Sequence, residues 1–263
     1  MRRRPALAAT AVAAALLLGG CSAGASDNDS KPATSAAPQT LTVFAATSLT
    51  ASFDTLGKAF EKANPGVTVR FDYDGTSTLV TQLSQGAPAD VLASADEKNM
   101  QTALAQKLIA GNPIDFASNV LEIATAPGNP HHLAGWADLA RPGIRVDVCA
   151  DGVPCGNATA AVEKATGVSL KPISEEQNVG DVLAKVESGD ADAGVVYVTD
   201  VKGAGAKVTG VAFPEARSAV NTYPIAQTAN AANAALAKKF IAFVTGAPGQ
   251  KVLAAAGFGA PPT

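Results

Sequence analysis

The chain has 263 residues, a net charge of −3 and 47% hydrophobic residues. This length allows one large domain or two lobes. The acidic balance, with no basic stripe, excludes a nucleic-acid-binding protein. It also gives no global attraction to an anion, so any anion site must be built locally.

The first 20 residues predict export. Arg2, Arg3 and Arg4 precede an apolar run, Ala6–Leu18, that is too short to span a bilayer comfortably and has the charge arrangement of a secretory signal peptide. The run ends at Leu18-Gly19-Gly20-Cys21, which resembles the bacterial lipobox. The resemblance implies cleavage before Cys21 and lipidation of that cysteine, which would anchor the protein to the outer face of the cell membrane. The alternatives are an ordinary signal peptide with a chance cysteine, or a retained transmembrane anchor.

Residues 21–40 are predicted to be a flexible tether. They are rich in Ser, Ala, Asp, Asn and Pro and show no apolar periodicity, so they bury too little surface to fold. A lipid and a flexible linker would let the folded body work near the membrane. Loss of the leader, with its three arginines, lowers the net charge from −3 to −6.

From Leu41 onward, short β-rich segments alternate with helical patterns. The predicted strands are Leu41–Ala45, Val67–Tyr73, Asp90–Ser94, Val120–Thr125, Ile144–Val148, Gly194–Val198 and Val208–Phe213. The predicted helices begin near Ser48, Thr78, Asp96, Asn157, Gly180 and Asn233, and a last short one follows Pro248-Gly249. The first carries Leu49, Phe53, Leu56 and Phe60 on one face and is expected to stop near the breaker Asn64-Pro65-Gly66. This alternation predicts α/β architecture with largely parallel sheets. Val120–Thr125 and Thr222–Thr228 are both extended and apolar, and could be two crossings between lobes.

Two cysteines remain after Cys21. Cys149 and Cys155 are close in sequence, and in an oxidising compartment such a pair indicates a disulfide. A metal site is not expected, because no cluster of cysteine or histidine completes four ligands.

The helix starts carry the clearest functional signal. Four of them are built from small or neutral residues: Ala46-Thr47-Ser48, Gly75-Thr76-Ser77, Pro154-Cys155-Gly156 and Gln177-Asn178-Val179. A helix N-terminus presents unpaired N–H groups and about half a positive charge. Several such ends converging would bind a small anion without a cationic side chain. Each hydroxyl taken singly is also a common helix N-cap. Taken together, these residues indicate a two-lobed α/β protein that binds an anion or another small solute.

At these residues the chain resembles the periplasmic molybdate-binding proteins of ABC transporters. The similar segments occur in the family's order: Val43–Thr50, Thr76–Leu79, Gly86–Val91, Ser94–Asp96, Gly194–Tyr197, Phe213–Glu215 and Tyr223–Ala226. The resemblance extends from about Leu41 to Phe258. It implies a type II periplasmic-binding-protein fold, in which two α/β lobes are joined by two crossover strands and the ligand binds in the cleft between them. On this basis we expect lobe I at 41–121 and 225–263, and lobe II at 122–224.

The resemblance also implies a set of ligand-binding residues. Ser48 and Thr76 would donate through their N–H and hydroxyl groups, Cys155 and Val179 through their backbone N–H groups, and Tyr197 through its phenol. No metal ion would be coordinated directly, and no cofactor is expected. Cysteine at position 155 departs from the best-known members of the family.

Some alternatives remain at this level. Ser77 could replace Thr76 as the second hydroxyl donor. The resemblance implies capture of molybdate, with tungstate, by a monomer that delivers it to an ABC permease. Sulfate or another tetrahedral oxyanion is the nearest other ligand.

An exported hydrolase is the rival from another class. No G-x-S-x-G elbow surrounds Ser48, and His131 and His132 lie in a loop expected to be exposed. The carboxylate pairs Glu175–Glu176 and Asp190–Asp192 resemble helix-end and turn residues. We therefore expect a binding protein and no enzyme.

Overall fold

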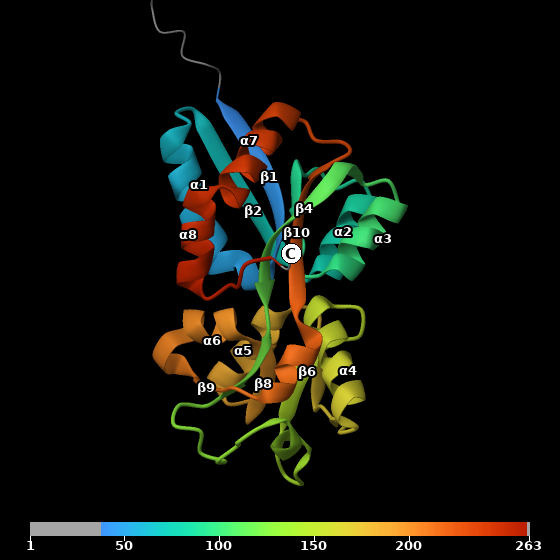
Figure 1. The fold of residues 1–263 in the computed structure, drawn as a ribbon, viewed down its shortest axis with the longest axis vertical. Helices are drawn as coiled ribbons and strands as arrows, with labels where there is room; N and C mark the ends of the chain where they lie inside the picture. Colours follow the sequence, from blue (N-terminus) through green and yellow to red (C-terminus); the bar gives the residue numbers. More distant parts are fainter. Residues whose placement is uncertain (1–37, 262–263) are drawn as a thin grey trace, which may run out of the picture. The chain divides into compact units, whose positions relative to one another are not determined.

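The computed structural model describes residues 38–261, and the predicted signal peptide, the predicted lipidation site Cys21 and most of the predicted tether lie outside them. The described part of the chain contains no helix with the length and apolar character needed to span a membrane. It forms two five-stranded sheets, each covered by helices, which make two α/β lobes (Figure 1).

The sheet of the first lobe has the strand order β2-β1-β3-β10-β4. Its strands are β1 (Gln39–Ala46), β2 (Val67–Asp74), β3 (Val91–Ala93), β4 (Ile109–Asn119) and β10 (Asn221–Thr228). β1 pairs in parallel with both β2 and β3, whereas β10 runs antiparallel to β3 and β4. The carboxyl ends of β1, β2 and β3 therefore meet at one edge of this sheet.

Helices cover both faces of the first sheet. They are α1 (Thr50–Ala63), α2 (Thr76–Ser84), α3 (Glu97–Ala105), α7 (Ala234–Thr245) and α8 (Ala247–Ala256). In Figure 1, α1, α7 and α8 lie on one side of the sheet and α2 and α3 on the other. Neighbouring residues of β1 point to opposite faces, so Val43 packs with the first group and Phe44 with the second.

The helix α1 illustrates how the sequence pattern sets the packing. Leu49, Phe53, Leu56 and Phe60 recur at helical spacing, and all four are at most 2% exposed. The rings of Phe53 and Phe60 pack edge-on against Phe240 of α7. α1 ends at Ala63, just before the predicted breaker at Asn64-Pro65-Gly66.

The second lobe repeats this arrangement in the strand order β7-β6-β8-β5-β9. Its elements are β5 (Leu121–Thr125), η2 (Trp136–Ala140), β6 (Val146–Cys149), α4 (Pro154–Thr166), β7 (Ser174–Glu176), α5 (Val179–Ser188), β8 (Ala193–Tyr197), α6 (Val198–Ala204), η3 (Gly205–Lys207), β9 (Thr209–Val211) and η4 (Pro214–Ala219). β6 pairs in parallel with β7 and β8, and β5 runs antiparallel to β8 and β9. The carboxyl ends of β6, β7 and β8 thus share one edge of the second sheet.

The chain passes between the two sheets twice. Only Val120 separates β4 of the first sheet from β5 of the second, and the return follows η4 into β10. All residues of β10 pair in the first sheet, so the predicted boundary between residues 224 and 225 falls inside this strand.

The predicted tether also overlaps a strand. β1 begins at Gln39, two residues before the predicted start at Leu41, because Gln39 and Thr40 continue the parallel pairing with Val67 and Thr68 of β2. A turn, η1 (Thr47–Leu49), connects β1 to α1.

Candidate functional site

The five residues expected to bind ligand line one cavity between the lobes. Ser48 and Thr76 reach it from the first lobe, and Cys155, Val179 and Tyr197 from the second. The cavity is small, with a volume of about 10 Å³, enough for about one water molecule. The other residues that line it are Ala46, Thr47, Asp74, Gly75, Ala95, Val153, Pro154 and Asn178. Ser77, the alternative to Thr76, does not line it.

Strand direction explains why these residues meet. The lining segments follow the carboxyl ends of β1, β2 and β3 in the first lobe and of β6, β7 and β8 in the second. Because each group of strands is parallel, the turns after its members lie at the same edge of the sheet. The crevice outside these carboxyl ends is where open α/β sheets generally bind ligands.

Three helices begin at the cavity wall. α2 begins at Thr76, α4 at Pro154 and α5 at Val179, and neither α2 nor α4 has a side-chain cap. The N–H groups of a first helical turn have no partner within the helix. Together with the helix dipoles, they make this wall electropositive although no lysine, arginine or histidine lines it.

Hydroxyl groups supply further donors. The Thr76 hydroxyl accepts a bond from the N–H of Ala95 (3.1 Å), which leaves its proton free to donate. The hydroxyls of Thr47 and Tyr197 are buried and have no hydrogen-bond partner among the described residues. An unsatisfied buried hydroxyl costs about 1–3 kcal/mol, so both groups favour a cavity occupant that accepts hydrogen bonds.

A second tyrosine supports the first loop from behind. The Tyr223 hydroxyl lies 3.0 Å from Ser48 Oγ and accepts a bond from Asn119 Nδ2 (3.4 Å). Asn119 is the last residue of β4, and its Oδ1 accepts the N–H of Val120 at the crossing between the lobes. This contact links the Ser48 hydroxyl to the first crossing segment.

Burial keeps the tyrosines near the cavity protonated. Burial raises the pKa of Tyr197 well above its usual value, and burial also raises the pKa of Tyr223. Asp200 accepts the N–H of Tyr197 (2.9 Å), and burial raises its own pKa to about 7. At neutral pH both phenols therefore act as neutral hydrogen-bond donors.

A disulfide braces the wall of the second lobe. The Sγ atoms of Cys149 and Cys155 are 1.99 Å apart, and both residues are at most 3% exposed. The bond ties the end of β6 to the first turn of α4, where Cys155 lines the cavity. It therefore restrains one of the three helix starts.

Two glycines allow the lobes to approach closely. A Cβ atom on Gly75 would lie 2.0 Å from the backbone oxygen of Gln177 in the other lobe, and one on Gly180 would lie 2.6 Å from Cγ2 of Thr47. Sequence reasoning missed Thr47, Gly75 and Tyr223 as parts of the site. Thr47 and Gly75 adjoin predicted ligand residues, but only the approach of the lobes identifies their role.

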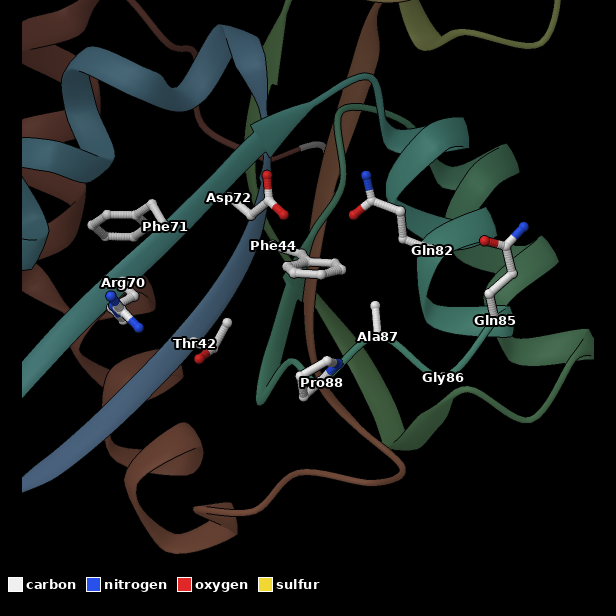
Figure 2. A pocket seen from close by; sticks show the side chains of 10 residues that line it. All are labelled: Thr42, Phe44, Arg70, Phe71, Asp72, Gln82, Gln85, Gly86, Ala87 and Pro88. Carbon is white, nitrogen blue, oxygen red and sulfur yellow. The ribbon is translucent and has the colours of Figure 1, made fainter.

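A larger depression lies elsewhere on the first lobe. Figure 2 shows Gln82 of α2 and Gln85 just after it, across from Thr42, Arg70 and Asp72 on β1 and β2. Its lining comes from this lobe alone and includes no helix start. It therefore lacks the convergent donors of the interlobe cavity.

The histidines and carboxylate pairs considered for catalysis lie outside the cavity. His131 Nε2 is 3.5 Å from Asp192, and Asp192 also pairs with Arg145 (2.7 Å). Glu176 pairs with Lys185, which lowers the carboxyl pKa. The described residues hold no group of three or more His, Cys, Asp or Glu side chains placed to bind a metal ion.

Residues 41–259 match the family described as bacterial extracellular solute-binding protein. The chain belongs to this family. It is 47% identical over 251 residues to the molybdate-binding protein ModA of Mycobacterium tuberculosis, covering 95% of this chain and 96% of that relative.

Solved structures of similar proteins share the fold. The periplasmic molybdate-binding protein of Azotobacter vinelandii matches with a TM-score of 0.75 and 26% identity, over 84% of this chain and 100% of that one. The sulfate-binding protein SubI of M. tuberculosis also gives a TM-score of 0.75, at 20% identity over 84% of this chain and 86% of that one, and supports the fold alone. The type II fold with two α/β lobes is thus confirmed.

Proposed function

We propose that this protein captures molybdate outside the cytoplasm and delivers it to an ABC import permease. The observation that carries the proposal is the interlobe cavity, where three helix starts converge with the unpartnered hydroxyls of Thr47 and Tyr197. The 47% identity to a molybdate-binding relative over nearly the whole chain supports the same ligand.

The donors suit a fully ionised tetrahedral oxyanion. Each oxygen of such an anion only accepts hydrogen bonds, and the cavity offers N–H groups, hydroxyls and the neutral phenol of Tyr197. Asp74 is the one carboxylate among the described lining residues, and its Oδ1 accepts the N–H of Gly75 (2.7 Å) and faces Asn178 Nδ2 (3.4 Å), so this oxygen is already engaged by donors of the protein. A protonated anion such as hydrogen phosphate would need an acceptor for its proton, so the site should discriminate against it.

The number of donors is sufficient for tight binding. A hydrogen bond to a charged group contributes about 1.5–3 kcal/mol. Around seven such bonds, less the costs of desolvation and of closing the lobes, would account for micromolar or tighter affinity, about −8 kcal/mol. Molybdate and tungstate are larger than sulfate and have longer bonds. We propose that both bind and that a cavity sized for them holds sulfate less tightly.

We propose that ligand selects the closed form of the protein. Donors come from both lobes, so the complete set forms only when the lobes are together. The permease would then recognise the closed, loaded form. The protein would act as a monomer, since both halves of the cavity come from one chain.

Titration of the purified chain with molybdate, tungstate, sulfate and phosphate tests the function. Ligand at a hundredfold its Kd stabilises a protein by about 2.7 kcal/mol, so a clear rise in Tm is expected with molybdate and tungstate. A rise with sulfate alone would change the ligand, and no rise with any of the four would refute oxyanion capture.

We further propose that the mature protein is a lipoprotein anchored through Cys21. The lipobox-like Leu18-Gly19-Gly20-Cys21 supports this. Cells expressing the protein should incorporate labelled palmitate into it, and Cys21→Ala should abolish the label. Equal labelling of both forms would contradict the proposal.

A further inference from the structure

Hydrogen bonds join the start of α3 to the start of α4 across the cleft. Asn157 Nδ2 donates to Asp96 Oδ2 (2.9 Å), and Lys98 Nζ donates to Asn157 Oδ1 (2.8 Å). A third bond runs from Asn99 Nδ2 to the backbone oxygen of Gly152 (3.1 Å). Asp96, Lys98 and Asn99 belong to the first lobe, and Gly152 and Asn157 to the second, so all three bonds link the lobes.

These residues adjoin the cavity without lining it. Ala95 lines the cavity immediately before Asp96, and Cys155 lines it two residues before Asn157. Neither Asp96 nor Asn157 is among the lining residues. The bonds between them therefore hold two parts of the cavity wall together without contacting an occupant.

The chemistry of Asp96 allows this contact to break and re-form. Asp96 is 7% exposed, and its carboxylate accepts the N–H of Asn99 (2.9 Å) and the Asn99 amide as well as Asn157. When the lobes separate, only the Asn157 bond is lost, and the bonds from Asn99 within α3 remain. Opening therefore does not leave the buried charge without partners, which would be very costly.

The opposite side of the cavity closes differently. There, Asn178 Nδ2 lies 3.4 Å from Asp74 Oδ1, a long contact, and Gly75 packs directly against the backbone of Gln177. That side depends on close packing, whereas the α3–α4 side has three direct hydrogen bonds, of which those of Asn157 to Asp96 and Lys98 are charge-assisted.

We propose that Asp96, Lys98, Asn99 and Asn157 form an interlobe latch that holds the protein closed around its oxyanion and sets how long the anion is retained. The inference rests on the proposed function. The latch residues are positioning residues, because they act on the alignment of the two cavity walls. Apparent affinity falls as the closed form becomes less populated, so loss of the latch should accelerate release.

The direct test is release of radiolabelled molybdate from the purified full chain after dilution into excess unlabelled molybdate. Asn157→Ala removes two of the three latch bonds and should raise the dissociation rate about tenfold, with the association rate nearly unchanged. Tungstate release should accelerate by the same factor, since the cavity donors are intact. Lys98→Met, at an exposed position, should raise the dissociation rate less than Asn157→Ala does. The double variant should raise this rate by less than the product of the two single factors.

Asn64→Ala is the matched control. Asn64 is half-buried like Asn157 and donates to Phe60 O (2.8 Å) within the first lobe. Asn64→Ala should leave the release rate within about twofold of wild type. Equal release from Asn157→Ala and wild type would overturn the latch, as would equal acceleration by Asn64→Ala.

Hydrogen–deuterium exchange at a saturating concentration of whichever tested oxyanion raises Tm, sulfate included, separates the latch from the proposed function, because the closed form is then populated. Asn157→Ala should speed exchange in segments 94–99 and 152–157, and Asn64→Ala should not. Exchange in both segments equal to wild type would overturn the latch. Failure of the wild-type chain to retain molybdate or tungstate would overturn the proposed function, and the exchange result would still decide on the latch.

Discussion

Replacement of Gly75 by alanine offers a sharp test of closure between the lobes. Gly75 has φ −60° and ψ 138°, a conformation that alanine adopts without strain. Its new Cβ would lie 2.0 Å from the oxygen of Gln177, and all of that conflict lies across the cleft. The substitution should therefore spare the fold of the first lobe and impede closure.

The size of the effect follows from the contact distance. Real Cβ atoms essentially never approach another heavy atom closer than 3.0 Å, so the two backbones must separate by at least about 1 Å. A hydrogen bond of about 2.9 Å from the start of α5 would then exceed the usual limit. Loss of even one bond to the anion, worth about 1.5–3 kcal/mol, weakens binding roughly tenfold to a hundredfold.

Calorimetric titration with molybdate measures this change directly. Gly203→Ala is the matched control, because a Cβ on Gly203 in α6 meets nothing within 4 Å. Gly75→Ala should change the Tm of the ligand-free protein only slightly, since helix-cap and unfolded-state effects are each below about 1 kcal/mol. A Kd for Gly75→Ala within twofold of wild type would refute the claim that contact at Gly75 is needed for binding.

Three further predictions follow from the site and the second lobe. Thr47→Val should raise the Kd for molybdate about tenfold, because it removes an unpartnered hydroxyl from the cavity wall. Thr159→Val removes an unpartnered hydroxyl outside the cavity and should leave the Kd unchanged. Joint replacement of Cys149 and Cys155 by serine should lower the free energy of unfolding by about 2 kcal/mol in urea denaturation, and an unchanged midpoint would contradict this. Burial raises the pKa of Asp147 from 3.8 to about 6, so the folded form binds the proton more tightly than the unfolded form. The free energy of unfolding should therefore rise as the pH falls from 6 toward 3.8. Asp147→Asn should raise Tm at neutral pH and remove this part of the pH dependence; a Tm unchanged at every pH would show that Asp147 does not titrate in the fold.

Much of the architecture could be predicted from local pattern. The apolar spacing of Leu49, Phe53, Leu56 and Phe60 predicted α1 and its buried face, and both are observed. The strand–helix alternation predicted α/β architecture, which is observed, because apolar periodicity reports directly which residues face a core. It also predicted largely parallel sheets, and this was wrong: both sheets are mixed, since β10 and β5 run antiparallel to their neighbours.

The missed elements are those in which local preference and final structure disagree. β4 (Ile109–Asn119) was not predicted, since it is an edge strand that contains Gly111 and Pro113 and shows no regular alternation of burial. α6 was missed because its first residues continue the β-branched run of β8. The Asp200 carboxylate, which accepts the N–H of Tyr197, favours the helix there.

The sequence by itself determined the two lobes, the small and hydroxylated residues at the helix starts, and a neutral set of hydrogen-bond donors. These features depend on residue types and on spacing within a few turns of chain. Only the tertiary structure decided that Thr76 rather than Ser77 lines the cavity, that Thr47 contributes an unpartnered hydroxyl, and that Gly75 must lack a side chain. Each of these depends on where segments about 100 residues apart approach one another, because the interatomic distances across a cleft are set by the packing of both lobes and not by either segment alone.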